Sequence, residues 1–143
     1  MSNYLTNQEM ASLVEAIQTA ENCSTGEIRV HIDSNTEDNN AEMAFEVFKT
    51  LCKDKTAERN AVLFHVNFEQ KYLTIIGDEG IHEKVHQDFW DKMHDDITSE
   101  FAKGKYYDAL KNAVLDTGQE LKKFFPISDG HNPNELPNEI TFS

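Results

Sequence analysis

Basic residues are scarce in this sequence, and their scarcity narrows the range of ligands. The 143 residues include 13 lysines and arginines against 26 aspartates and glutamates, which gives a formal net charge of −13. Because such a chain repels phosphate backbones and anionic lipid surfaces, we expect no nucleic-acid ligand. The same charge favours metal ions and protein partners with a basic surface, although an acidic surface also serves simply to keep a protein in solution.

Cysteine is rare, and long apolar runs are missing. Cys23 and Cys52 form neither a disulfide framework nor a CxxC metal motif, so we expect both to be reduced, structural thiols. The first ten residues, MSNYLTNQEM, do not form a signal peptide, and no apolar run approaches the roughly 20 residues of a membrane span. The sequence therefore predicts a cytoplasmic protein without a membrane span, which we expect to be a monomer.

Most signatures of catalysis are missing too, with one exception. The chain has no GxSxG nucleophile elbow, no GxGxxG and no Walker A loop. His82, Glu83 and His86, however, spell HExxH, the spacing at which two imidazoles on one helix bind zinc beside a glutamate base. A helical wheel places both histidines on the inward side, but Lys84 lies between them and no third ligand follows at a familiar spacing. A zinc hydrolase is therefore the least favoured interpretation.

The remaining histidines and one acidic loop offer little support for another site. His94 falls on a different face of the same predicted helix, and nothing in the sequence indicates that the others lie close together, namely His31, His65 and His131. The polar stretch after residue 32 holds three carboxylates, Asp33, Glu37 and Asp38. This group is either a solvated loop or a weak cation site.

Two periodicities alternate along the chain and predict one α/β domain. Apolar residues at helical spacing predict helices at 7–22, 44–51, 81–102 and 105–125. Alternating or continuous apolar residues predict strands at 27–33, 61–66 and 72–76. A strand, helix, strand connection is expected to be parallel and right-handed, whereas the short link at 67–71 predicts an antiparallel hairpin.

These rules predict a three-layer α/β/α sandwich, with a mixed sheet of three to four strands flanked by about four helices. Residues 1–126 are expected to form the single domain, because Pro126 ends the last helix. Residues 127–143 are expected to form a C-terminal tail that can add a short edge strand at 139–142.

Polar side chains converge at one end of this predicted sheet. The two parallel strands start there, with Glu27 on the first and Arg59 and Asn60 before the second, and the hairpin returns the chain to the same end at Asp78 and Glu79. Carboxylate and amide oxygens suit a hard divalent cation. Glu27, Asn60, Asp78 and Glu79 are therefore candidate ligands for calcium or magnesium, which fit them better than zinc does.

A purely structural interpretation of the same residues is also open. Arg59 can form an ion pair with Glu27 or with Asp78, as exposed charges commonly do. Asp78 can instead cap the helix that follows it. The sequence alone does not decide between these roles.

Several segments of the sequence are together typical of one known family. The longer ones are STGEIRVHI at 24–32, TAERNAVL at 56–63 and IIGDEGI at 75–81. Shorter ones are FWD at 89–91, FAKGKY at 101–106 and NELP at 134–137. The longer segments resemble the TPM domain family, and the shorter ones fit its small bacterial members. The resemblance covers nearly the whole chain and implies a compact α/β/α domain.

The resemblance also carries expectations about function. Plant thylakoid members are described as metal-binding acid phosphatases, while many bacterial relatives carry signal peptides and membrane anchors that we do not find here. The family pattern falls on Thr56, Arg59, Asn60, Gly77 and Asp78, which overlap the predicted cation site. A phosphatase needs a cationic group for substrate phosphate, and Arg59 is the candidate at this end. We therefore expect a domain that binds a calcium-like cation, with acid phosphatase activity as one hypothesis and a non-catalytic protein-interaction module as its alternative.

Overall fold

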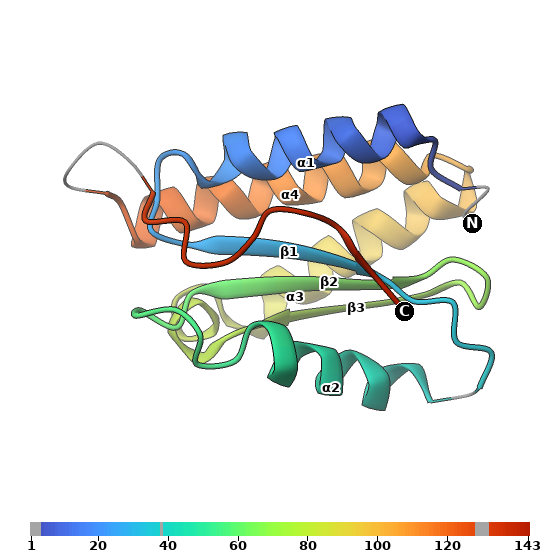
Figure 1. The fold of residues 1–143 in the computed structure, drawn as a ribbon, viewed down its shortest axis with the longest axis horizontal. Helices are drawn as coiled ribbons and strands as arrows, with labels where there is room; N and C mark the ends of the chain where they lie inside the picture. The colour runs from blue at the N-terminus through green and yellow to red at the C-terminus, as the bar shows by residue number, and fades with distance from the viewer. Residues whose placement is uncertain (1–3, 38, 128–131) are drawn as a thin grey trace.

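The fold has the element order that the sequence predicts. A computed structural model of the chain describes residues 4–37, 39–127 and 132–143 (Figure 1), so the predicted candidates Asp38 and His131 lie outside the described residues. The elements are α1 (Asn7–Glu21), β1 (Glu27–Ile32), α2 (Asn40–Leu51), β2 (Ala61–Asn67), β3 (Tyr72–Gly77), α3 (Glu79–Ala102), α4 (Tyr106–Phe124) and β4 (Thr141–Phe142). Across the described ranges, no helix is both long and apolar enough to cross a membrane.

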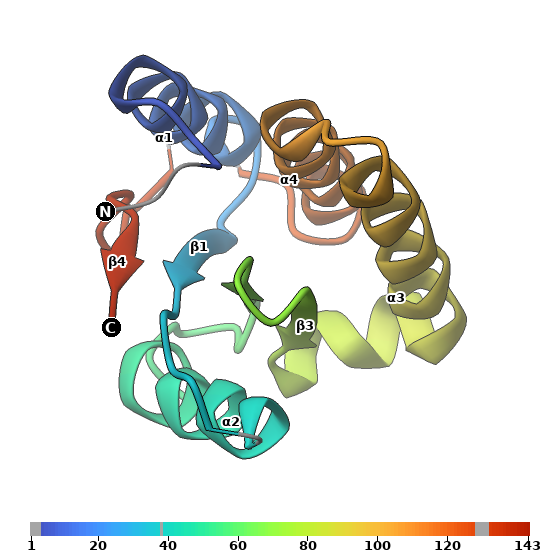
Figure 2. The same cartoon turned by 90° about the vertical axis from the view of Figure 1, so that its right-hand side faces the viewer.

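The strands form one mixed sheet in the order β3-β2-β1-β4. β1 runs parallel to β2 and to β4, and β2 runs antiparallel to β3. Helices α1, α3 and α4 lie on one side of the sheet and α2 lies on the other (Figure 2). The predicted three-layer α/β/α sandwich with a mixed sheet and four helices is therefore confirmed.

The two faces of β1 differ sharply in chemistry, yet both are buried. Ile28, Val30 and Ile32 pack into the main core with the even-numbered residues of β2 and with α1, α3 and α4. The opposite face holds Glu27 and two neighbours, Arg29 and His31, whose exposed fractions are 0%, 4% and 5%. Alternation predicts the two faces correctly, but a polar face on a strand ordinarily meets water. Burial obliges these side chains to find partners within the protein.

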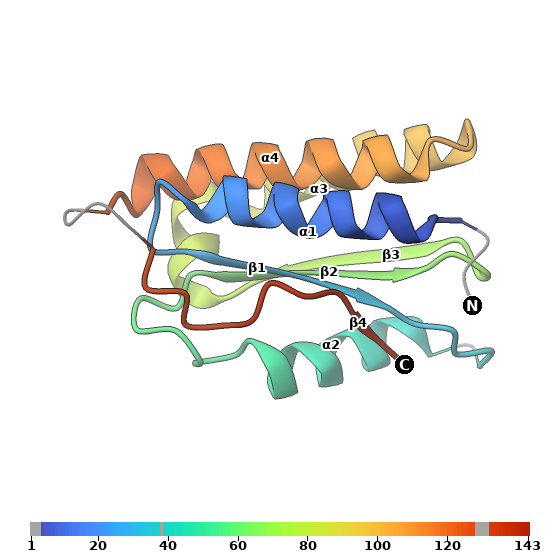
Figure 3. The same ribbon diagram turned by 45° about the horizontal axis from the view of Figure 1, so that its top comes forward.

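The C-terminal segment helps to cover this polar face. Residues 132–143 run beside β1 (Figure 3), and Leu136 joins a small second cluster with Phe48 of α2 and Leu63 of β2. The segment ends in β4, which pairs with the last two residues of β1. Charged and imidazole side chains of β1 are thus enclosed by α2 and by the end of the chain.

The start of α3 is positioned by a close backbone approach. A Cβ atom on Gly80 would lie 2.1 Å from the carbonyl oxygen of Glu58 and 2.6 Å from that of Arg59, so only glycine fits there. The amide of Ile81 also donates to the carbonyl of Arg59 (3.3 Å). These contacts hold the first turn of α3 against the loop that leads into β2.

Candidate functional site

The amino ends of β1 and β2 place two buried polar side chains at the same end of the sheet, as the parallel pairing predicts. The amide of Glu27 donates to the carbonyl of Asn60 (3.4 Å), and both residues are completely buried. Oε1 of Glu27 accepts a hydrogen bond from the amide of Leu136 (3.1 Å), and Nδ2 of Asn60 donates to Oγ1 of Thr25 (2.9 Å). Glu27 Oε2 and Asn60 Oδ1, in contrast, accept no hydrogen bond from any residue that the structure describes.

Asp78 lies beside this end of the sheet and acts as the N-cap of α3. Its Oδ1 accepts from the amide of Glu79 (2.8 Å), and its Oδ2 accepts from the amide of Asp54 (2.9 Å). The side chain is almost fully buried. It therefore ties the α2–β2 loop to the start of α3, while each carboxylate oxygen keeps a lone pair for a further donor or a cation.

Arg59 and Glu79 form an exposed ion pair at the surface of this end. Nη1 of Arg59 lies 2.8 Å from Oε2 of Glu79, and its Nε lies 3.3 Å from Oδ1 of Asp54. The expected pairing of Arg59 with Glu27 or Asp78 is not what forms. Pairs this exposed contribute at most about 1 kcal/mol to stability.

The predicted ligands are therefore brought to the same end but are not assembled into a cluster. Among the described residues, Glu27, Asp78 and Glu79 do not place three carboxylate oxygens within 4.8 Å of one another. The donor set still fits a hard cation, since calcium and magnesium accept carboxylate and amide oxygens and keep several water ligands.

A buried carboxylate that the sequence did not single out lies next to Glu27. Oε2 of Glu21, at the end of α1, accepts from the amide of Ile28 (2.7 Å). Burial, with the nearby Glu27 carboxylate acting in the same direction, raises the pKa of Glu21 to about 8. Burial likewise raises the pKa of Glu27 to about 7, against the opposing effect of the Leu136 amide. The amino end thus holds two carboxyl groups for which the folded protein favours protonation.

The other end of the same strands holds a group of three potential metal ligands. His31, Asp33 and His65 are all buried, and each offers one ligand atom within 4.8 Å of the other two. Nε2 of His65 lies 3.0 Å from Oδ2 of Asp33, and the two imidazole rings stack with centroids 5.5 Å apart. This group could hold a metal ion.

The polar contacts of the two imidazoles differ. Nδ1 and Nε2 of His31 lie 2.7 Å from Oγ1 of Thr141 and 2.7 Å from Oγ of Ser143, so both nitrogens are taken by the C-terminal segment. Nδ1 of His65 is buried and has no hydrogen-bond partner in the described part of the chain. Burial lowers the pKa of His31 to about 4, and burial also lowers that of His65 although Asp33 opposes it.

The predicted parallel pairing of the two strands already implied that His31 and His65 lie side by side. The expectation that nothing brings His31 near His65 was wrong, because β1 and β2 pair in parallel with Glu27 opposite Ala61. The same offset along the two strands places His31 opposite His65. Asp33 is not part of a solvated loop, which was one of the two interpretations of its acidic stretch, because it is buried against His65, whereas Glu37 is exposed.

The HExxH motif does not form the geometry that its sequence suggests. His86 has φ 66° and ψ 172°, which interrupts α3 between the two histidines. His82 and His86 are both exposed, so the inward orientation expected for them was wrong. Nδ1 of His82 accepts from Nε1 of Trp90 (3.1 Å). Without a continuous helical turn, the i and i+4 imidazoles do not share one face.

Comparison with known proteins agrees with this fold. The family model described as the TPM domain matches residues 1–120, and the chain belongs to that family. The NMR structure of the BA42 protein from the psychrophilic bacterium Bizionia argentinensis is 35% identical, with a TM-score of 0.86 over 100% of this chain and 98% of that one. The NMR structure of the N-terminal domain of a P. gingivalis protein has a TM-score of 0.68 at 16% identity over 85% of this chain and 78% of that one. No curated protein matches by sequence.

Proposed function

We propose that this TPM domain binds a hard divalent cation, calcium or magnesium, at the amino ends of β1 and β2. One observation carries the proposal. Glu27 Oε2 and Asn60 Oδ1 are both buried and both lack a donor within the described chain, a state that ordinarily costs about 1–3 kcal/mol per group. A cation held by these oxygens, with Asp78, Glu79 and water completing its shell, would satisfy both.

Calcium titration of the protein tests this proposal, followed by calorimetry and by amide NMR shifts. We expect Glu27→Gln, which preserves the shape of the side chain, to weaken calcium binding more than roughly tenfold, because a carboxylate ligand loses its charge. Glu46→Gln is the matched control, since Glu46 is an exposed carboxylate on α2 paired with Lys49. Equal calcium affinity in Glu27→Gln, Asp78→Asn and the unmodified chain would contradict the assignment.

We further propose that the bound cation supports hydrolysis of phosphate esters. Arg59 supports it, because its side chain is 55% exposed beside Glu79 and its guanidinium can meet a phosphate group at the surface. The measurement is turnover of an aryl phosphate with calcium or magnesium present, from acid to neutral pH. Absence of turnover under all these conditions would leave cation binding as the function.

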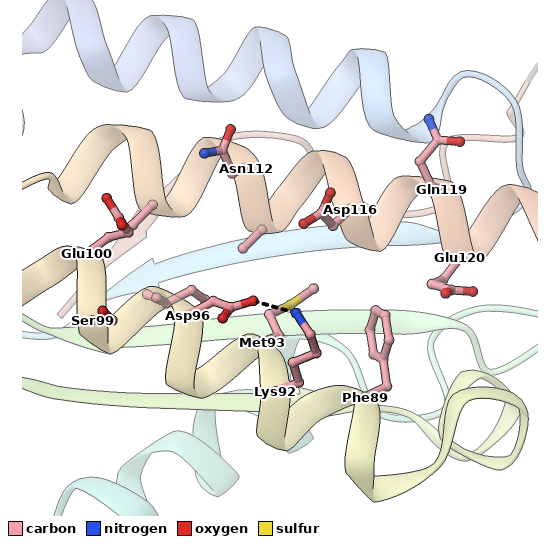
Figure 4. A pocket seen from close by; sticks show the side chains of 13 residues that line it. Phe89, Lys92, Met93, Asp96, Ser99, Glu100, Asn112, Asp116, Gln119 and Glu120 are labelled. Atoms are coloured by element: carbon pink, nitrogen blue, oxygen red, sulfur yellow. Dashed lines mark hydrogen bonds and ion pairs between the residues drawn. The ribbon is translucent and has the colours of Figure 1, made fainter.

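A non-catalytic interaction module is the second candidate, and a groove between α3 and α4 favours it. The groove has a volume of about 540 Å³, and its floor includes Met93 and Ile97. Its rim carries more carboxylates than cations (Figure 4), namely Asp96, Glu100, Asp116 and Glu120 against Lys92. Such a rim complements a partner with a basic surface. Asp116→Lys with Glu120→Lys should abolish binding of a basic peptide, and unchanged binding would exclude this groove.

A further inference from the structure

The opposite end of the sheet carries a second set of metal ligands with different chemistry. We propose that His31, Asp33 and His65 bind a transition metal of the zinc type, separately from the hard cation at the amino end. The two ends of β1 would then select metals by ligand type, with oxygen at one end and imidazole at the other. Either proposal can fail without the other, because they involve different residues and different metals.

The donor set decides the class of metal. Two imidazoles and one carboxylate suit zinc and its neighbours, whereas calcium and magnesium prefer ligand shells made only of oxygen. Nε2 of His65 lies 3.0 Å from Oδ2 of Asp33, so the nitrogen and the carboxylate can bind one metal ion when the ring proton resides on Nδ1, on the far side of the imidazole. That Nδ1 is buried and has no partner among the described residues, so no neighbouring donor there opposes this tautomer.

The spacing requires only a small contraction. The three ligand atoms lie within 4.8 Å of one another, and ligand atoms of a tetrahedral zinc site lie about 3.4 Å apart. Rotation of the His31 ring and the Asp33 carboxylate supplies movement of this size. The fourth position would be left to water, as in zinc sites with three protein ligands.

The end of β1 that carries Asp33 borders a hollow in the protein surface. A hollow of about 510 Å³ is lined by Asp33, Ser34, Phe142 and Ser143, together with side chains of α1 and of the β2–β3 link. Asp33 thus belongs both to the wall of this hollow and to the ligand group.

The C-terminal strand competes directly with the metal. Thr141 and Ser143 occupy both nitrogens of His31, so a metal can reach that ring only by displacing one hydroxyl. β4 is two residues long, and Phe142 is 58% exposed, so little packing holds the strand in place. Metal binding should therefore loosen β4, and β4 should in turn lower metal affinity.

The positive charge of Arg29 should weaken metal binding at this site, and this effect can be tested. Arg29 is buried on the same face of β1, two residues before His31, and its Nε has no acceptor among the described residues. Its positive charge acts against a cation at His31. Removing that charge should tighten metal binding without touching a ligand.

Zinc and cobalt titrations test the proposal. We expect one equivalent of zinc to bind, and cobalt bound in its place to give the intense visible absorption of a tetrahedral site. His65→Gln and Asp33→Asn should each weaken zinc binding more than roughly tenfold. The matched controls are His82→Gln and His86→Gln, which alter exposed histidines and should leave the affinity unchanged. Stoichiometric binding that survives in His65→Gln, or is lost in His86→Gln, overturns the proposal.

If a variant of a buried residue fails to fold, the proposal can still be tested on the unmodified chain. Nitrogen-15 spectra of the imidazole rings report which nitrogens coordinate the metal. We expect zinc to shift the ring nitrogens of His31 and His65 together with the amides of residues 141–143. Shifts confined to His82, His86 or His94 would overturn the proposal. An excess of calcium should not displace the zinc, which separates this site from the amino end.

Discussion

His31 of β1 and His65 of β2 are register partners in a parallel pair, and their rings stack at an interplanar angle of 14°. This relationship places two imidazoles beside Asp33 without any local sequence motif. It also fixes which hydroxyls can reach His31, since Thr141 is the register partner of His31 on its other side.

Removing the hydroxyls that hold His31 should raise zinc affinity. Thr141→Val or Ser143→Ala removes one competitor for an imidazole nitrogen, and a hydrogen bond of about 0.5–1.5 kcal/mol corresponds to a roughly twofold to tenfold gain. Thr50→Val is the control, because its hydroxyl bonds only to the Glu46 carbonyl on α2. Calorimetry measures the effect, and a loss of affinity in Thr141→Val would mean that the hydroxyl supports the metal rather than competing with it.

Stability should fall with rising pH because of Glu21. The folded state holds the Glu21 proton up to about pH 8, while a carboxyl with the ordinary pKa of 4.5 releases it earlier. The folded state therefore binds more protons between these values, and the free energy of unfolding decreases as pH rises through them, by up to about 1.4 kcal/mol per pH unit.

The variant Glu21→Gln isolates this contribution. Its amide oxygen can still accept from Ile28, so its unfolding free energy should depend less on pH than that of the unmodified chain, most clearly between about pH 5.5 and 7, where the folded state keeps a proton that the unfolded chain has released. Denaturant titrations at several pH values measure it, with the exposed Glu15→Gln on the same helix as control. Identical slopes for Glu21→Gln and the unmodified chain would contradict a buried, protonated Glu21.

Replacing Arg29 should stabilise the protein. Its guanidinium is 4% exposed and its Nε finds no acceptor in the described chain, so the fold carries a desolvated charge with little compensation. Arg29→Met keeps most of the side-chain volume and should raise the free energy of unfolding by on the order of 1 kcal/mol or more. Arg59→Met at the surface should change it little. A destabilised Arg29→Met would show that the charge is compensated by neighbouring carboxylates.

Gly80→Ala should be strongly destabilising. The added Cβ would meet backbone carbonyls of Glu58 and Arg59 at 2.1 and 2.6 Å, and backbone cannot move aside as a flexible side chain can. We expect a loss of about 1–3 kcal/mol or more. Gly104→Ala is the comparison, since that position has φ 77° and an added Cβ would have no neighbour within 4 Å among the described residues, so it carries backbone strain alone. Thermal unfolding of the two variants ranks them, and a larger loss at Gly104 would refute the close approach.

The fold could be predicted because each element has a local signal. The capping box of Thr6 and Glu9 starts α1 where the sequence places it, and the alternation from Glu27 gives the correct faces of β1. The burial of Arg29 and His31 could not be predicted in the same way, because alternation looks identical whether the polar face meets water or another segment. What encloses that face is a distant stretch of chain, and only the assembled fold shows it.

The candidate sites also include features that the sequence predicts and features that only the structure shows. The position of Glu27 and Asn60 at one end of the sheet could be predicted because parallel strands start together, and the same pairing of β1 with β2 places His31 opposite His65. The interruption of α3 at His86 has no marker in the sequence, since neither proline nor glycine lies there. HExxH therefore indicated a helix face that the backbone does not provide.

Hydrogen exchange at the short β4 strand can report how often this edge of the sheet opens. The amide of Ser34 donates to the carbonyl of Ser143 (2.9 Å), and the amide of Ser143 donates to the carbonyl of Ile32 (3.0 Å). The amide protons of Ser34 and Ser143 exchange with solvent when β4 detaches from β1. This local opening needs far less free energy than unfolding of the core. Their exchange rates therefore record how often the end of the chain uncovers His31, whether or not a metal is present.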